Sequence, residues 1–240
     1  MRIPAITGVI ERRILANYRI DPDVLTKALP APFRPQLHEG VAVGGICLIR
    51  LRAIRPRWMP WAIGLSSENA AHRFAVEWDT DQGVQQGVYI PRRDTSSRAN
   101  ALVGGRLFPG VHHHADFEVN ESEARYSVAM TADDGTHVRV AGTVAETLPE
   151  DSVFASVGDA STFFEKGCLG YSDTRTPGTY DGLELRTLAW KVTPLSVEDT
   201  ASSFFADRAR FPEGSVELDC ALLMRDIPHE WHGRAAIRAP

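Results

Sequence analysis

Three consecutive histidines, His112, His113 and His114, are the side chains of this sequence best suited to acid/base chemistry. If residues 111–119 form a strand, its side chains alternate between two faces, and His113 shares a face with the apolar residues of the segment. Burial disfavours the charged ring, so a histidine in an apolar cavity tends to be neutral and can act as a general base. We therefore take His113 as a catalytic candidate; the alternative is a hydrogen-bonded core histidine.

The histidines also raise the alternative of a metal site. His112 and His114 lie with Asp116 on the second face of the segment, where imidazoles of one strand can converge on a metal ion. A second arrangement combines His113 with His72. No fourth ligand occurs at a fixed spacing, although metal sites are defined by their ligand number and geometry. We therefore expect no metal and no other cofactor, and keep a histidine-ligated metal enzyme as an alternative.

A carboxylate and several guanidinium groups form a second set of candidates. Glu68 and Arg73 are five residues apart in a segment that leads into a predicted strand. We expect them to flank a cavity, with Arg73 binding a substrate carboxylate through two hydrogen bonds and Glu68 transferring protons. Arg106 is a second candidate for carboxylate binding, and Tyr89 is expected to line the same site. The alternative is a salt bridge between Glu68 and Arg73.

The elements that must position these side chains are mostly short strands. Alternating or continuous apolar residues predict strands at residues 41–52, 73–79, 87–90, 111–119, 183–192 and 215–224. A hairpin is predicted at residues 126–144, where Asp134 and Gly135 supply the tight turn. Helical spacing and capping residues predict helices at residues 21–30, 99–102, 151–166 and 197–209.

These patterns predict one domain, residues 1–240, of the α+β class, with a mainly antiparallel sheet and a few peripheral helices. No repeat, low-complexity tract or change of composition marks a linker. Many short strands must hide their edges, so we expect the sheet to be closed.

Composition and charge narrow the class of partner. The formal net charge is -5, with basic and acidic residues interspersed, so no basic stripe is available for nucleic acid. The three cysteines show no CxxC spacing, which predicts a reducing compartment, the cytoplasm. No apolar run approaches the ~18 residues that span a bilayer, so no membrane association is expected. A small-molecule ligand is the expected partner, and a homo-oligomer is left open.

Residues 105–114 (GRLFPGVHHH) resemble the signature of the acetoacetate decarboxylase family. In that signature a glycine-arginine-glutamate start leads through an aromatic residue and a glycine to a proline and two lysines, the first of which forms the Schiff base. In a gap-free comparison three residues match: Gly105, Arg106 and Gly110. Leucine replaces the glutamate, and histidines replace the proline and both lysines. The register of this replacement is open by one residue.

Three further segments, residues 68–69, 87–89 and 221–231, look more like an uncharacterised bacterial branch of that superfamily, a domain of unknown function. The resemblance implies a curved antiparallel sheet that forms a cone or double barrel around a cavity. It also implies small oxo acids as the class of substrate.

Acetoacetate decarboxylase activity is nevertheless not expected, because Schiff-base catalysis needs a neutral primary amine in the site. The sequence holds only three lysines, Lys27, Lys166 and Lys191. Lys27 lies in a predicted surface helix, and Lys166 lies at a helix end, where a cation interacts favourably with the helix dipole. Lys191, beside Trp190 in a predicted strand, is the one amine that could face inward.

We therefore expect a pocket protein that binds an oxo-acid-like or other carboxylate-bearing molecule without a Schiff-base lysine. A lyase or hydrolase type of enzyme fits this expectation, with His113 and Glu68 as acid/base groups. Whether a reaction is catalysed is left open. A non-catalytic ligand-binding or sensing module is the second hypothesis, because one scaffold can host different activities.

Overall fold

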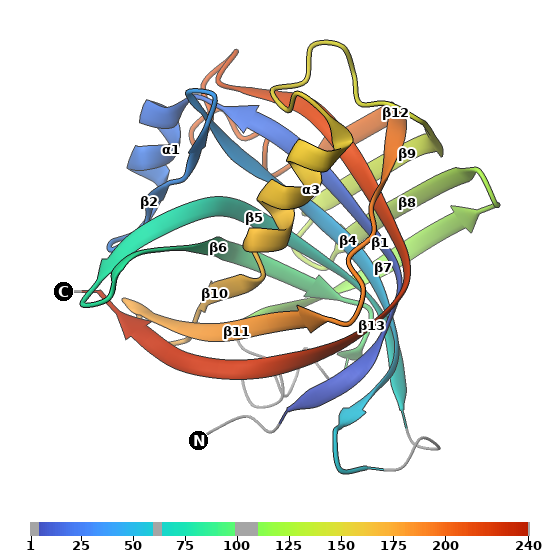
Figure 1. Ribbon diagram of the computed structural model, residues 1–240, viewed down its shortest axis with the longest axis horizontal. Coiled ribbons are helices and arrows are strands. Elements are labelled where there is room, and N and C mark those ends of the chain that lie inside the picture. Colours follow the sequence, from blue (N-terminus) through green and yellow to red (C-terminus); the bar gives the residue numbers. More distant parts are fainter. Residues whose placement is uncertain (1–4, 60–63, 99–109, 240) are drawn as a thin grey trace.

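The computed structural model describes residues 5–59, 64–98 and 110–239, most of which form one large curved sheet (Figure 1). Its thirteen strands are β1 (Ile6–Ile20), β2 (Arg34–Pro35), β3 (Leu37–His38), β4 (Val41–Pro56), β5 (Leu65–Thr80), β6 (Gly83–Thr95), β7 (His112–Glu121), β8 (Arg125–Ala132), β9 (His137–Val144), β10 (Leu169–Asp173), β11 (Thr179–Thr187), β12 (Thr193–Ser202) and β13 (Val216–Arg238). The described helices are α1 (Pro22–Ala28) and α3 (Val157–Lys166). Strand pairs are antiparallel except where β6 meets β7 and β10. The predicted α+β class with a mainly antiparallel sheet is confirmed.

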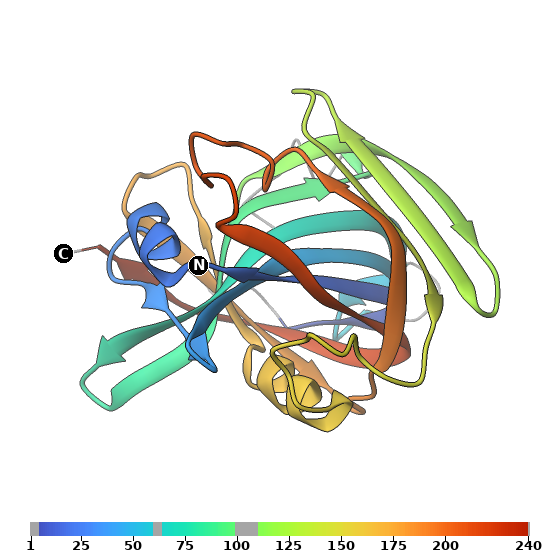
Figure 2. The same ribbon diagram turned by 90° about the horizontal axis from the view of Figure 1, so that it is seen from above.

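The sheet closes on itself along two circuits that share five strands. The shared strands run in the order β13-β1-β4-β5-β6. One circuit is completed by β10 and β11, because β10 pairs with β6 and β11 pairs with β13. The other is completed by β7, β8, β9 and β12; in the view from above, β8 and β9 extend away from α1 (Figure 2). The predicted closed, curved sheet is thus confirmed, as a ring of strands rather than a regular barrel.

Side chains of the shared strands alternate between two faces, as the pleat requires. On β1, Ile14 packs in an apolar cluster with residues of β8, whereas Leu15 packs in a cluster with residues of α3. On β4, Leu48 and Cys47 are divided in the same way. We call these two sides of the shared strands the β8 face and the α3 face.

A β-bulge in β6 changes which of its side chains point to the α3 face. Between two successive pairs of the β5–β6 ladder, β5 moves by two residues, from Phe74 to His72, while β6 moves by three, from Tyr89 to Arg92. The extra residue shifts the alternation of β6. As a result Arg93 points to the α3 face.

The helices predicted at residues 21–30 and 151–166 are confirmed as α1 and α3, although α3 is shorter than predicted. In α1 the Asp21 carboxylate accepts hydrogen bonds from the backbone N–H groups of Asp23 and Val24, as expected of an N-cap. Helix α3 begins at residue 157 instead of 151, because Ser156 caps it by accepting a hydrogen bond from the Asp159 N–H. Figure 1 shows α3 in front of the shared strands, above β10 and β11.

The predicted helix at residues 197–209 is wrong. Residues 193–202 form β12, which pairs with β9 and β13. The β-branched Val197 and Thr200 fit a pleated strand. Phe204 and Phe205, whose spacing suggests a helix, instead lie in a turn after the strand and pack on the β8 face. The predicted helix at residues 99–102 lies outside the described residues.

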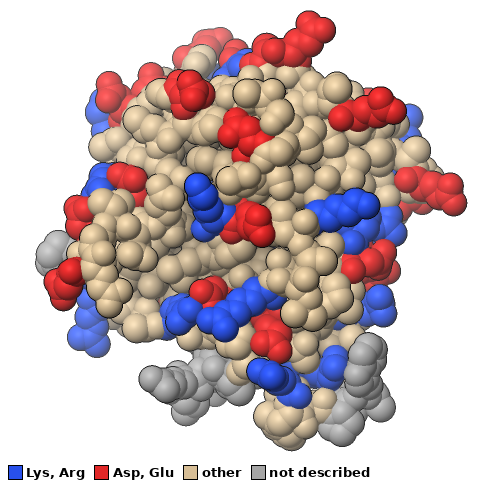
Figure 3. Space-filling view, viewed as in Figure 1, with Lys and Arg blue, Asp and Glu red and all other residues tan. Residues whose placement is uncertain are grey.

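Basic and acidic side chains are interspersed on the face shown in Figure 3, so neither sign of charge dominates it. Among the described residues, no helix combines the length and the apolar character that crossing a membrane requires.

Candidate functional site

The α3 face of the shared strands borders a cavity of about 310 Å³. Strands of the first circuit form its wall, together with the C-terminal end of α3 and the first residue of β7. Most lining side chains are apolar, and the charged or reactive ones include Arg13, Cys47, Arg73, Arg93 and His112. An apolar cavity with a few polar groups is typical of a small-molecule site.

Arg73 enters this cavity and is 6% exposed. Its Nη2 donates a hydrogen bond to Asn17 Oδ1 at 2.7 Å, and its guanidinium carbon lies 5.0 Å from the centre of the Phe164 ring. Its Nε has no partner. Burial lowers the pKa of Arg73 to about 10, so the side chain is still a cation at neutral pH.

Backbone contacts fix the side chain of Asn17 beside Arg73. Asn17 Nδ2 donates to the Leu15 carbonyl at 3.1 Å, which fixes the amide so that its oxygen faces Arg73. Gly45 lies between Asn17 and Arg73 in the strand ladder. A Cβ at Gly45 would lie 2.5 Å from the Ala16 carbonyl oxygen and 3.3 Å from Asn17 Oδ1, so glycine keeps these strands close.

Arg13, Arg55 and Arg93 also line the cavity, and two of them have partners that are not carboxylates. Arg93 Nε donates to Ser172 Oγ at 2.9 Å, and burial lowers the pKa of Arg93 to about 10. Arg13 Nε donates to Cys47 Sγ at 3.2 Å. Within the described ranges, neither Arg13 nor Arg93 forms an ion pair with a carboxylate, and neither does Arg73. Buried cations without counter-ions are costly, so the cavity is prepared electrostatically for an anion.

Asp94, the one carboxylate among the described lining residues, is already neutralised. Arg92 binds it through Nη2 at 2.7 Å and through Nε at 3.0 Å. Arg92 is in turn shared with Asp134 at 2.7 Å. The charge of Asp94 is therefore satisfied from outside the cavity.

His112 lines the cavity as a neutral ring. Its Nδ1 lies 3.2 Å from the Gly110 carbonyl oxygen. A carbonyl only accepts hydrogen bonds, so Nδ1 carries the proton and Nε2 carries the lone pair. Burial and then the positive charge of Arg93 lower the pKa of His112 to about 4. A neutral imidazole with a lone pair on Nε2 can accept a proton from a ligand.

The structure places His113 at the exposed surface instead of in the cavity. β7 pairs in parallel with β6 through residues 112–114 and antiparallel with β8 through residues 115–121. The inward position of Ala115 therefore does not extend to His113, because the strand changes partner between them.

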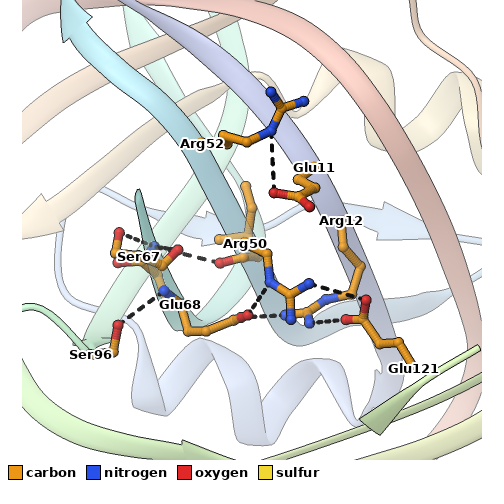
Figure 4. A network of polar contacts seen from close by, with 10 residues as sticks. Glu11, Arg12, Arg50, Arg52, Ser67, Glu68, Ser96 and Glu121 are labelled. Carbon is orange, nitrogen blue, oxygen red and sulfur yellow. Dashed lines mark hydrogen bonds and ion pairs between the residues drawn. The ribbon is translucent and has the colours of Figure 1, made fainter. Parts of the chain in front are cut away.

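Glu68 lies on the β8 face, in a network of four charged side chains (Figure 4). Arg12, which is fully buried, binds Glu68 at 2.5 Å and also binds Glu121. Arg50 binds the same two carboxylates. Glu68 and Arg73 are five residues apart on one strand, so the pleat sends them to opposite faces. Glu68 therefore neither shares the cavity with Arg73 nor pairs with it.

Tyr89 also points away from the cavity. Its ring stacks on Phe33 at 5.4 Å, and its hydroxyl donates to the carboxylate of Asp173 at 2.9 and 3.0 Å. Arg106 lies outside the described residues. In the part of the chain that the structure describes, no three His, Cys, Asp or Glu side chains gather closely enough to hold a metal ion.

All three lysines of the sequence are exposed, and none lines the cavity. Lys27 and Lys166 lie in α1 and at the end of α3. Lys191 follows the end of β11 and does not face inward.

No motif in the sequence marks Arg13, Cys47 or Arg93. Strand alternation alone could have placed Arg13 with Leu15, but it does not say which face of β1 encloses a cavity. Arg93 reaches the cavity through the bulge in β6, which leaves no signal in the sequence.

The buried network predicts that Arg12 is important for stability. Arg12→Met leaves Glu68 and Glu121 with Arg50 alone, and breaking a buried pair costs about 3 kcal/mol of unfolding free energy. Arg139→Met, which removes an exposed ion pair with Asp199, should cost less than about 1 kcal/mol. Urea denaturation measures both. Equal losses in the two variants would show that the network does not stabilise the fold.

Two buried histidines and the half-buried His112 predict acid-sensitive stability. Burial lowers the pKa of His72 to about 3 and those of His112 and His229 to about 4. The unfolded chain, where their pKa is ~6.5, binds protons more readily. The unfolding free energy should therefore fall as the pH drops below ~6.5, by about 2 kcal/mol for each histidine at pH 5. Urea denaturation between pH 7 and pH 5 tests this, with a smaller loss expected in His112→Asn; a stability independent of pH would contradict it.

Comparison with solved structures shows the same fold in acetoacetate decarboxylase-like proteins. An acetoacetate decarboxylase-like enzyme from Sphingomonas wittichii RW1 has 12% identity and a TM-score of 0.59, covering 99% of this chain and 93% of its own. Acetoacetate decarboxylase from Legionella pneumophila has 11% identity and a TM-score of 0.63, covering 95% and 86%. The enduracididine biosynthesis enzyme MppR, complexed with pyruvate, has 10% identity and a TM-score of 0.58, covering 98% and 89%.

At these identities the likeness establishes the fold and leaves the activity open. No curated protein matches the sequence. A family model described as "Uncharacterized conserved protein (COG2071)", DUF2071, matches residues 9–223. The predicted resemblance to an acetoacetate decarboxylase-like branch of unknown function is confirmed, and the chain belongs to the DUF2071 family.

Proposed function

We propose that the protein binds a small carboxylate-bearing molecule of the oxo acid class in the cavity on the α3 face. Chemistry in this cavity uses groups other than a primary amine. The observation that carries the proposal is that three of the lining arginines, Arg13, Arg73 and Arg93, have no carboxylate partner in the described ranges.

The arrangement of these arginines suits a carboxylate. A guanidinium group binds a carboxylate through two parallel hydrogen bonds, and Arg73 offers a buried Nε without a partner. Arg73 and Arg93 extend from the neighbouring strands β5 and β6 into the same cavity. The apolar wall suits the carbon chain of a small acid. A protein of the same fold, MppR, forms a complex with pyruvate, which supports an oxo acid as the ligand class.

His112 takes the acid/base role in this proposal, because it lines the cavity with a neutral ring. Arg106 is retained as a further anion-binding residue. A non-catalytic binding or sensing module is the second candidate, since Glu68 and Tyr89 point away and Asp94 is neutralised. Faster deuterium exchange at the methyl group of pyruvate in the presence of the protein would favour the enzyme.

The charge of the ligand should determine its affinity. We expect pyruvate to bind and its neutral amide, pyruvamide, to bind at least about tenfold more weakly, because an ionic hydrogen bond contributes about 1.5–3 kcal/mol. Arg73→Met and Arg93→Met should each weaken pyruvate binding by a similar factor, and Arg106→Ala tests the retained anion-binding residue. Isothermal titration calorimetry measures all of these.

Arg139→Met is the matched control, because Arg139 is exposed and does not line the cavity. Its affinity for pyruvate should equal that of the wild type. Equal affinity of the wild type for pyruvate and pyruvamide would overturn the proposed carboxylate site.

Borohydride treatment should not trap an oxo acid on the protein. Reduction of a Schiff base requires an amine in the cavity, and all three lysines are exposed outside it. Intact-protein mass after incubation with pyruvate or acetoacetate should match that of the protein treated with borohydride alone. A reduced adduct mapped to a lysine would show that this amine reaches the ligand and that the exclusion of Schiff-base chemistry is mistaken.

A further inference from the structure

Cys47 belongs to the apolar cluster on the α3 face and also borders the cavity. It is 7% exposed and lines the cavity from the middle of β4. Its neighbours across the ladder are Leu15 on β1 and Ala71 on β5. Ala71 in turn lies opposite Arg93 on β6, so one small side chain separates Cys47 from Arg93 in the ladder.

Three arginines line the same cavity as Cys47, and one of them contacts its sulfur. Arg13 donates a hydrogen bond from Nε to Sγ at 3.2 Å, and a negatively charged sulfur accepts such a bond more strongly than a neutral thiol. Arg93 lies across Ala71 from Cys47 in the ladder, and Arg73 lines the same cavity. Cations beside a cysteine stabilise its nucleophilic thiolate form.

The cavity also contains an unsatisfied donor beside this thiol. Only 6% of Arg73 is exposed, yet its Nε has no hydrogen-bond partner. The Arg73 side chain points into the cavity that Cys47 lines. A carboxylate bound there would satisfy this donor and place the neighbouring carbon of the ligand in the cavity that Cys47 lines. The thiol and the anion-binding group therefore belong to one site.

We propose that Cys47 is a nucleophile that adds to the carbonyl carbon of an oxo acid held by Arg73 and Arg93. This inference rests on the proposed function, because the arginines must bind the carboxylate first. In the addition, a bond forms between Sγ and the carbonyl carbon, and the π bond of the carbonyl opens onto its oxygen. That oxygen takes up the proton that the thiol gives up, so the thiohemiketal forms without a further reactant. The thiol thus makes the same kind of nucleophilic addition that an amine makes in the first step of Schiff-base formation.

The other two cysteines provide internal comparisons. Cys168 also lines the cavity, but its Sγ donates to the Glu165 carbonyl at 2.7 Å, and burial raises the pKa of its thiol. Cys220 is 1% exposed, does not line the cavity, and burial raises the pKa of its thiol. Both are predicted to react slowly.

Alkylation by a charged and a neutral reagent tests the site. Iodoacetate carries a carboxylate, whereas iodoacetamide is its neutral counterpart, and each transfers its carbon to sulfur with loss of iodide. For each thiol the rate of reaction with iodoacetate is divided by the rate with iodoacetamide. We expect this ratio to be about tenfold or more higher for Cys47 than for N-acetylcysteine, which reports the intrinsic reactivity of the two reagents. Pyruvate should protect Cys47. Peptide mapping by mass spectrometry identifies the modified cysteine, and Cys220→Ser, outside the cavity, should behave as the wild type.

Carbon-13 NMR of pyruvate labelled at its carbonyl carbon tests the addition itself. With the wild type we expect a bound signal in the region of tetrahedral carbons. The signal should be absent with Cys47→Ser. Hydrated pyruvate also has a tetrahedral carbon, and the spectrum with Cys47→Ser shows its contribution. A bound carbonyl signal that stays in the ketone region, or Cys47 alkylation without preference for iodoacetate, would overturn the inference.

The failure of this inference can be distinguished from failure of the proposed function. Cys47→Ser should still bind pyruvate in calorimetry, because the arginines are unchanged. If pyruvate binds the wild type but no adduct forms, the nucleophile assignment fails and the carboxylate site stands. If pyruvate does not bind the wild type, the carboxylate site and the nucleophile that depends on it both fail.

Discussion

The twofold alternation of side chains along five shared strands is the constraint on which the rest of this structure depends. β13, β1, β4, β5 and β6 take part in both closed circuits, so each of their residues faces either the β8 side or the α3 side. On the β8 face, Arg12 of β1 and Arg50 of β4 belong to a network of ion pairs. On the α3 face, Arg13 of β1 and Cys47 of β4 line the cavity. Neighbouring arginines in the sequence thus have opposite electrostatic surroundings.

The contrast between the two faces gives the buried charges a physical meaning. On the β8 face, two arginines meet two glutamates, so burial of charge is compensated within the chain. On the α3 face, Arg73 is held by an amide and an aromatic ring, and Arg93 by a hydroxyl, so their charges are oriented but not neutralised. Interactions that orient a cation without neutralising it leave its field available to a ligand. This is the physical basis for assigning the cavity to an anion.

Much of the fold could be predicted from the sequence, because local signals agree with the final structure there. Asp21 and Pro22 mark the start of α1, and Gly135, at φ 83°, forms the turn between β8 and β9. Local signals fail at residues 197–209, where pairing of β12 with β9 and β13 outweighs a helical spacing of aromatic residues.

The site was predictable only in part, because the pairing of strands that are distant in the sequence decides which side chains meet. Arg73 lies in the cavity, whereas Glu68 lies on the β8 face. The two residues are five apart on one strand, and side chains an odd number of residues apart point to opposite faces. His113 is exposed because β7 changes partner after residue 114, so alternation within one segment cannot place it. The absence of an inward lysine follows from the sequence almost directly, since only three positions had to be considered. The lining arginines that the sequence did not single out, Arg13 and Arg93, become visible only when β1, β4, β5 and β6 are assembled.

The most direct test of the account is a crystal structure of the protein with pyruvate. We predict that the carboxylate of pyruvate lies within hydrogen-bonding distance of Arg73 and Arg93, in the cavity beneath α3. Pyruvate bound elsewhere on the molecule, or bound in this cavity with its carboxylate turned away from both arginines, would contradict the central claim.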